Sequence, residues 1–149
     1  MALKRYATAH WEGDLKAGQG RISTPASGLL ADTRYGFNTR FGDGNTPESR
    51  GTNPEELIAA AHAGCFAMAL SNELAKAGHA PQAVDARAEV ELSMEGAPTI
   101  SAIRLTVKAK VPGIDAVKFR AIADDAKQNC PVSKALSAVP ISLEAELAG

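Results

Sequence analysis

One stretch, from Gly51 to Gly78, constrains the fold more than any other, because it predicts a single long helix with both ends marked. Asn53 is a favourable N-cap, Pro54 occupies the first helical position that proline prefers, and Glu56 follows the cap by three residues, as in a capping box. Gly78 readily adopts the left-handed conformation that ends many helices.

The predicted helix is apolar on most of its surface, which favours a place in the protein interior. Its apolar residues recur at helical spacing on two faces: Leu57, Ile58, Ala61, Cys65, Met68 and Ala69 on one, and Ala59, Ala63, Phe66, Leu70 and Leu74 on the other. We therefore expect this helix to be the central, buried element of the fold.

Segments of strand-like polarity flank the helix. Residues 4–41 predict a small antiparallel meander of short strands, with residues 36–41 running on from the third strand. Residues 84–95 and 100–111 alternate between apolar and polar side chains, which predicts a hairpin with one buried face and cross-strand charge pairs on the other. Asp115 can cap a helix through about Gln128, followed by a helical turn over 131–136 and a strand over 139–147. This order predicts one α+β domain over residues 1–149.

Composition excludes several classes of protein. The formal net charge of −1 argues against a nucleic-acid-binding surface. The first ten residues contain no apolar core of a signal peptide, and no apolar run approaches the roughly 18 residues of a membrane span. We expect a cytoplasmic protein with no membrane partner.

The two cysteines, Cys65 and Cys130, are the main chemical candidates, since cysteines in a cytosolic chain are more often free or redox-active than structural. Cys65 lies about three turns inside its helix, where the helix dipole has faded, so its thiolate needs a cation from elsewhere. Cys130 precedes Pro131 at a helix entry, so the local sequence makes it the more acidic thiol. The alternative for Cys65 is a small buried apolar residue.

His62 lies three residues before Cys65 and is either a base or, as we favour, a buried histidine with its hydrogen bonds satisfied. The chain has no Cys-x-x-Cys and no His-x-x-x-His, so we predict no metal site. Glu55 and Glu56 either complement the positive end of the helix or hold an arginine in place.

Six segments carry a resemblance over nearly the whole chain: His10 to Asp14, Tyr35 to Phe41, Gly51 to Ile58, Ala60 to Phe66, Val111 to Asp115 and Cys130 to Ser133. They resemble the OsmC branch of the OsmC/Ohr family of hydroperoxide reductases. The most specific features are Asn-Pro-Glu-Glu-Leu with a cysteine ten residues after its first glutamate, and a later Asn-Cys-Pro-Val. Gly64 stands where Ala is expected, and the loop over 43–50 is longer than usual.

The resemblance implies a thiol peroxidase that serves in antioxidant and stress defence. Organic hydroperoxides would be reduced to alcohols, and hydrogen peroxide more weakly to water, without a cofactor and at the expense of a dithiol of the lipoyl type. Cys65 is implied as the peroxidatic cysteine and Cys130 as the resolving cysteine, joined in a disulfide after a sulfenic acid. Arg40 is implied to activate the thiolate and Glu55 to position that arginine; Arg21, Arg34 and Arg50 are the other candidates for this charge.

The resemblance also implies antiparallel sheets packed on a long central buried helix, and an intertwined homodimer with two active sites at its interface. Apolar walls would favour organic substrates, and the candidates are Phe37, Phe41, Phe66, Met68 and Leu70. The alternative from another class is a non-catalytic protein, in which the two cysteines are core residues or a redox-sensing switch.

Overall fold

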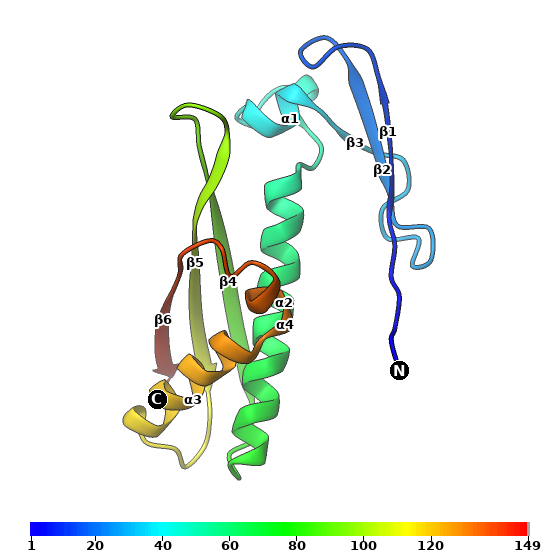
Figure 1. The fold of residues 1–149 in the computed structure, drawn as a ribbon. Helices are drawn as coiled ribbons and strands as arrows, with labels where there is room; N and C mark the ends of the chain where they lie inside the picture. The colour runs from blue at the N-terminus through cyan, green and yellow to red at the C-terminus, as the bar shows by residue number, and fades with distance from the viewer. Residues whose placement is uncertain (149) are drawn as a thin grey trace. The chain divides into compact units, whose positions relative to one another are not determined.

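The structure, a computed structural model, describes residues 1–148 and contains two compact units, Met1–Leu57 and the chain from Ile58 onward (Figure 1). The long helix α2 (Pro54–Lys76) begins in the first unit and continues into the second. The assignment of residues 1–149 to one domain stays a prediction.

The first unit contains the predicted antiparallel meander of β1 (Thr8–Glu12), β2 (Gln19–Ser23) and β3 (Thr33–Tyr35). The prediction that residues 36–41 run on from the third strand is wrong, because they form the short helix α1 (Phe37–Phe41). The Thr39 hydroxyl accepts from the Gly36 N–H at 2.8 Å and donates to the Gly36 carbonyl at 3.0 Å, which turns the chain into the helix. A 3₁₀ turn, η1 (Pro47–Ser49), follows.

Both predicted ends of α2 are confirmed, with one difference in detail. The Asn53 side chain accepts a hydrogen bond from the Glu56 N–H at 2.8 Å, as an N-cap does. In a capping box the Glu56 carboxylate would accept from the backbone N–H of Asn53. Here it accepts from the Thr52 hydroxyl at 3.0 Å instead. At the other end Gly78 takes a φ of +85°, and the residue after it donates to the Leu74 carbonyl at 2.8 Å.

Replacing the N-cap, Asn53→Ala, is expected to lower the free energy of unfolding by about 1–2 kcal/mol. The substitution removes the cap and also the bond from Asn53 Nδ2 to the Thr39 carbonyl at 3.1 Å, which ties α1 to the start of α2. Urea unfolding followed by circular dichroism measures the change. The control is Asn72→Ala at an exposed position of α2, where alanine should leave stability equal or slightly higher. Equal stabilities of the two variants would contradict the capping role.

The second unit is built on a three-stranded sheet. β4 (Ala83–Ser93) and β5 (Thr99–Lys110) form the predicted antiparallel hairpin. β6 (Ile141–Ala148) pairs with β5 in parallel, so the expectation of antiparallel sheets throughout does not hold for this strand. The connection contains the helices α3 (Ala116–Asn129) and α4 (Pro131–Ala135), and such a long crossover allows a chain to return in the same direction.

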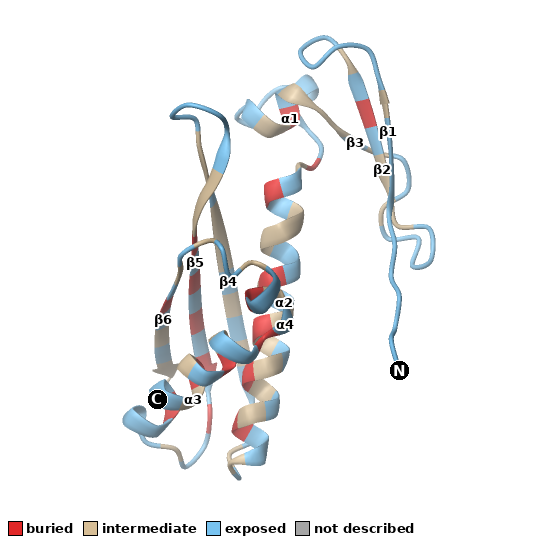
Figure 2. Ribbon diagram, in the orientation of Figure 1, coloured by how far each residue is buried: buried red, intermediate tan, exposed pale blue. Residues whose placement is uncertain are grey.

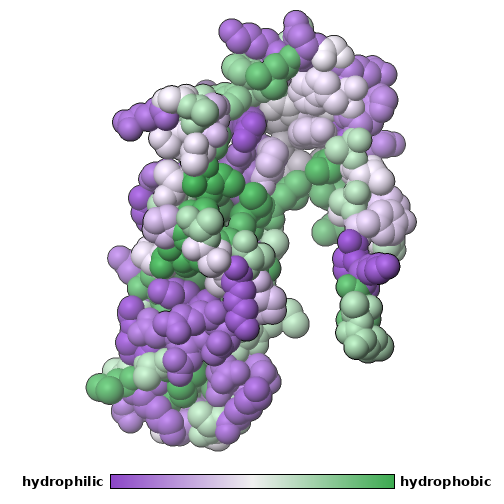
Figure 3. Space-filling view, viewed as in Figure 1, coloured by the Kyte–Doolittle hydropathy of each residue, from purple (hydrophilic) through white to green (hydrophobic). Residues whose placement is uncertain are grey.

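One face of this sheet is packed and the other is charged. Buried and exposed residues alternate along the second half of β5 (Figure 2). The buried ones belong to a core that also contains residues of α2 and α3. The buried core consists of Phe66, Leu70, Leu74, Leu105, Val107, Ala109, Val111, Phe119, Ala123, Ala126, Cys130 and Leu143. On the outer face Arg104 bridges Glu89 at 3.1 Å and Glu91 at 2.8 Å, which confirms the predicted cross-strand pairs. Hydrophilic side chains cover the lower part of this unit, over α3 and β6 (Figure 3).

Helix α2 is buried on one face only, although its composition predicted burial on most sides. Phe66 and Leu70 are fully buried, whereas Ala60, Gly64 and Met68 on the opposite side are exposed. A three-stranded sheet and α3 can cover only one face of a helix of this length. Contrary to the expectation that no segment approaches a membrane span, α2 is long and apolar enough for one by length and composition alone. The core helix of a globular protein can meet the same requirement, and here the inner face of α2 packs in a core.

Candidate active site

The structure brings the two cysteines together. The Cys65 and Cys130 sulfurs lie 2.9 Å apart as free thiols, one donating to the other, although 64 residues separate them in the chain. Cys65 projects from the middle of α2 and is partly buried, whereas Cys130 lies between α3 and α4 and has no exposed surface. Phe119 and Ala126 lie on the inner face of α3, and Cys130 follows Ala126 by four positions on the same face. All three side chains therefore belong to the core.

The two thiols differ in acidity in the order that the local sequence predicts. Burial raises the pKa of the Cys65 thiol, and the neighbouring Cys130 sulfur raises it further. Burial also acts to raise the pKa of Cys130, but hydrogen bonds from Cys65, from Ser133 and from the Val132 N–H outweigh it and lower that pKa. Cys65 therefore needs a cation to be a thiolate at neutral pH, because none of the groups that set its pKa here is one.

A second buried contact lies beside the thiols. His62 Nε2 on α2 and the Ser133 hydroxyl on α4 are 2.7 Å apart, and both side chains are buried. His62 Nδ1 is buried without a hydrogen-bond partner among the described residues, so the expectation of a fully satisfied histidine is wrong for this nitrogen. Sequence reasoning gave Ser133 no role, although its place three residues after Cys130 at a helix start was the available signal.

Arg40 and Glu55 form a multiple contact in the first unit. Arg40 Nε lies 3.1 Å from both carboxylate oxygens of Glu55, and its Nη2 lies 2.5 Å from Oε1. The glutamate side chain is only 11% exposed, so the pair is partly withdrawn from water and its geometry is fixed. The guanidinium carbon also lies 5.5 Å from the centre of the Phe41 ring, within the range of a cation–π contact.

A small apolar cavity of about 80 Å³ adjoins this arginine in the first unit. Phe37 and Phe41, two of the predicted wall residues, line it with their ring centres 4.8 Å apart. Its other lining residues are Trp11, Leu15, Tyr35, Gly36, Arg40 and Pro54. Sequence reasoning missed Trp11, Leu15 and Tyr35 as wall residues, because only the fold of the meander places them beside α1.

The other three predicted wall residues lie elsewhere. Phe66 and Leu70 have no exposed surface and belong to the core of the second unit, so a packing role accounts for both. Met68 is 76% exposed on the uncovered face of α2. Helical spacing divides these apolar residues of α2 between the core and the exposed face, and their assignment as wall residues stays a prediction.

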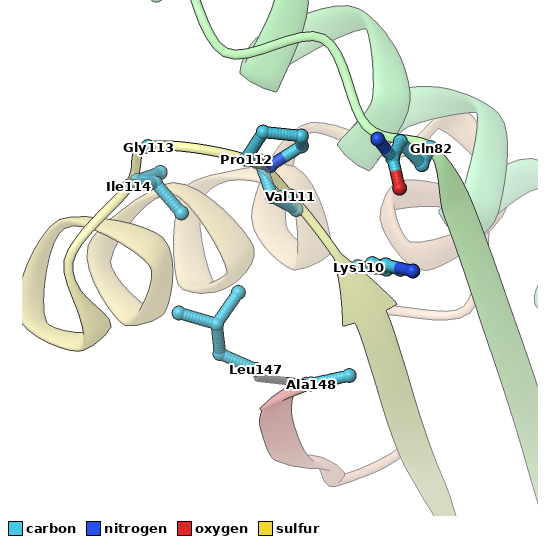
Figure 4. A pocket seen from close by; sticks show the side chains of 8 residues that line it. All are labelled: Gln82, Lys110, Val111, Pro112, Gly113, Ile114, Leu147 and Ala148. Carbon is cyan, nitrogen blue, oxygen red and sulfur yellow. The ribbon is translucent and has the colours of Figure 1, made fainter.

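An open pocket of about 460 Å³ offers little chemistry (Figure 4). It lies in the second unit where β5 ends, and among the described residues that line it the polar side chains are those of Gln82 and Lys110. Within residues 1–148 no group of three or more His, Cys, Asp or Glu side chains is arranged to hold a metal ion. The cysteine pair and the arginine–glutamate pair are therefore the candidate functional groups.

Comparison with known proteins identifies the family. A family model described as OsmC-like protein matches residues 43–144. The chain is 48% identical over 148 residues to peroxiredoxin OsmC of Escherichia coli, covering 99% of each protein. The chain belongs to the OsmC family. This membership confirms the predicted resemblance and the α+β fold, and it supports the prediction of a cysteine-based peroxidase.

Related proteins of the Ohr type are also similar. The chain is 32% identical over 96 residues to the organic hydroperoxide resistance protein OhrA of Bacillus subtilis, over 64% of this chain and 67% of that protein. The crystal structure of OhrB from the same organism has a TM-score of 0.64 at 25% identity, over 96% of this chain and 98% of that one. The fold of this OsmC-family member is therefore shared with the Ohr proteins.

Proposed function

We propose that this protein reduces organic hydroperoxides to alcohols, and hydrogen peroxide more slowly, through its two cysteines. The observation that carries the proposal is the 2.9 Å separation of the Cys65 and Cys130 sulfurs in a member of the OsmC family. A relative is named a peroxiredoxin and another an organic hydroperoxide resistance protein, which supports both the reaction and the substrate class.

Cys65 acts as the peroxidatic thiol in this proposal. Its thiolate attacks the peroxide oxygen, the O–O bond breaks, and the alcohol leaves as Cys65 becomes a sulfenic acid. Cys130 then attacks the Cys65 sulfur, which forms the disulfide and releases water. Partial exposure of Cys65 and complete burial of Cys130 support this division, because the first thiol must meet the substrate and the second need meet only Cys65.

Arg40 supplies the positive charge that Cys65 lacks. A guanidinium beside the sulfur lowers the thiol pKa and stabilises the alkoxide that leaves as the O–O bond breaks. The contacts to Glu55 support this role, since they hold the planar guanidinium in one orientation while leaving its Nη1 free of this carboxylate. Glu55 is then a positioning residue.

The cavity beside Arg40 supports an apolar substrate. Its walls carry four aromatic rings next to a cation, which suits a hydroperoxide with a hydrocarbon body and a polar reacting end. Hydrogen peroxide has no such body and gains nothing from these walls. We assign Phe37, Phe41, Trp11 and Tyr35 to substrate contact on this basis.

The proposal includes a homodimer and a dithiol reductant of the lipoyl type. The exposed face of α2, with Ala60, Gly64 and Met68, supports dimerisation because small and apolar side chains there suit close packing by a second copy. A dithiol suits the reduction step, since its second thiol can displace the first from the mixed disulfide. The proposed location is the cytoplasm.

A thiol count tests the function directly. Reduced protein mixed with a slight excess of cumene hydroperoxide is expected to lose both free thiols within seconds, with one equivalent of alcohol formed. Non-reducing mass spectrometry of the digested product should show a peptide pair joined through Cys65 and Cys130. Thiols that persist under these conditions would favour the non-catalytic alternative, and a covalent dimer would contradict the intramolecular disulfide.

A further inference from the structure

The buried contact between His62 and Ser133 has no part in the chemistry proposed above, yet it lies beside the resolving thiol. We propose that the two residues form a hydrogen-bond relay, in which His62 Nε2–H donates to Ser133 Oγ and the Ser133 O–H donates to the Cys130 sulfur. Ser133 then prepares Cys130 for its attack, and His62 is a positioning residue that acts through Ser133. The inference rests on the proposed function, because it concerns the resolving step.

Local geometry brings the three groups together. Cys130 is the cap residue of α4 and Ser133 is the third residue of that helix, and residues three positions apart lie side by side along one helix face. Both side chains are buried, and the Ser133 hydroxyl is among the groups that lower the pKa of Cys130. The Lys134 N–H donates to the Cys130 carbonyl at 3.0 Å and fixes the turn. His62 approaches Ser133 from α2. Only 0% of His62 and 5% of Ser133 are exposed, so the two side chains hydrogen-bond to each other rather than to bulk water.

The unpartnered nitrogen of His62 determines the direction of the relay. Burial lowers the pKa of His62, so the ring is neutral and carries one N–H. A buried N–H without a partner is costlier and rarer than a buried acceptor without one. Because Nδ1 has no partner, the hydrogen belongs on Nε2, where Ser133 Oγ accepts it. The single hydrogen of the serine hydroxyl then remains for the Cys130 sulfur.

This arrangement favours the charged form of the resolving thiol. A hydrogen bond to a thiolate stabilises it, in agreement with the lowered pKa of Cys130 despite its burial. In the resolving step the Cys130 sulfur forms a bond to the Cys65 sulfur and the Cys65 S–O bond breaks. Cys130 is oxidised, the sulfenic sulfur is reduced, and the proton that Cys130 gave up converts the departing hydroxide to water. The relay thus acts on the second step of the cycle rather than on peroxide cleavage.

The test separates the two steps. In Ser133→Ala the pKa of Cys130, measured by alkylation in a Cys65→Ser background, is expected to rise by about one unit, a tenfold loss of thiolate at neutral pH. The greater nucleophilicity of a less acidic thiol offsets part of this loss. The ratio of the disulfide formation rate to the sulfenic acid formation rate should therefore fall about three- to fourfold. His62→Leu should shift the pKa and the ratio in the same direction, and His62→Gln, which keeps a donor, should recover most of the loss.

Ser137→Ala is the matched control, since it removes an exposed hydroxyl just beyond α4 and should change neither the pKa nor the ratio. An unchanged Cys130 pKa and an unchanged ratio in Ser133→Ala overturn the relay. A ¹⁵N NMR spectrum of the histidine rings in the wild-type protein decides the matter even if the variants do not fold. It should show His62 protonated on Nε2, and protonation on Nδ1 overturns the relay. A wild-type protein that forms no disulfide overturns the proposed function instead, and the NMR result still decides the relay.

Discussion

Cys65→Ser is expected to abolish hydroperoxide reduction, whereas Cys130→Ser should react once and stop. A serine hydroxyl is not ionised at neutral pH and cannot cleave the O–O bond, so the first variant loses the attacking group. The second variant retains it but cannot form the disulfide, so Cys65 should persist as a sulfenic acid. Single-turnover kinetics with cumene hydroperoxide and trapping with dimedone measure the two results, with one adduct expected on Cys65 in Cys130→Ser.

The acidity of the two thiols makes the opposite assignment worth testing in the same experiment. The Cys130 pKa is lowered and the Cys65 pKa is raised in the second unit taken alone, which by itself would make Cys130 the more reactive thiol at neutral pH. A dimedone adduct on Cys130 in Cys65→Ser, formed at the wild-type rate, would reverse the two roles. Complete burial of Cys130 argues against that result, because an organic hydroperoxide must reach the sulfur.

Arg40→Ala is expected to slow the first step by about 100-fold, the size of effect found when one charge-stabilising donor is removed from an active site. It should also raise the Cys65 pKa, so a smaller fraction of this thiol is ionised at pH 7 and reactivity recovers only as the pH is raised. Arg40→Lys keeps the charge but loses the planar geometry that contacts Glu55, so it should recover only part of the rate. The pH dependence of alkylation and the single-turnover rate measure both effects.

Two further variants define the origin of the effect. Glu55→Gln keeps Arg40 but weakens the contact that orients its guanidinium, so we expect a smaller loss of rate than in Arg40→Lys. Arg34→Ala is the matched control, because Arg34 is an exposed arginine of the same unit whose Nη1 donates to the Pro47 carbonyl at 3.2 Å. An unchanged Cys65 pKa and rate in Arg40→Ala would falsify the assignment, and a loss in Arg34→Ala would transfer the role to that residue.

The sequence predicted correctly those helices and strands that are determined by residues near one another in the chain. Asn53, Pro54 and Gly78 marked the ends of α2, and alternation predicted β4 and β5 with their buried and charged faces. Residues 36–41 were mispredicted because a side-chain bond of Thr39, and not a periodic pattern, turns the chain there. The parallel pairing of β6 likewise depends on the path of the crossover, which alternation within a strand does not encode.

The candidate site depended more heavily on non-local structure. The sequence identified Cys65 and Cys130 as chemically interesting, but only the fold places their sulfurs together. The family resemblance pointed to Arg40 and Glu55, and their side chains are in contact in the structure. Nothing in the sequence linked His62 to Ser133, which lie 71 positions apart, and Phe66 and Leu70, which were candidates for cavity walls, pack in the core.

The 2.9 Å separation of the two thiols affects how well the protein itself withstands severe oxidative stress. A sulfenic acid that waits for its partner can meet a second peroxide molecule and pass to the sulfinic acid, a form that most cells cannot reduce. A nucleophile held in contact with the reacting atom behaves as if present at a concentration far above that of any dissolved oxidant. Under the proposed chemistry, closure of the disulfide therefore outcompetes the second oxidation, and the enzyme is protected against inactivation by its own substrate.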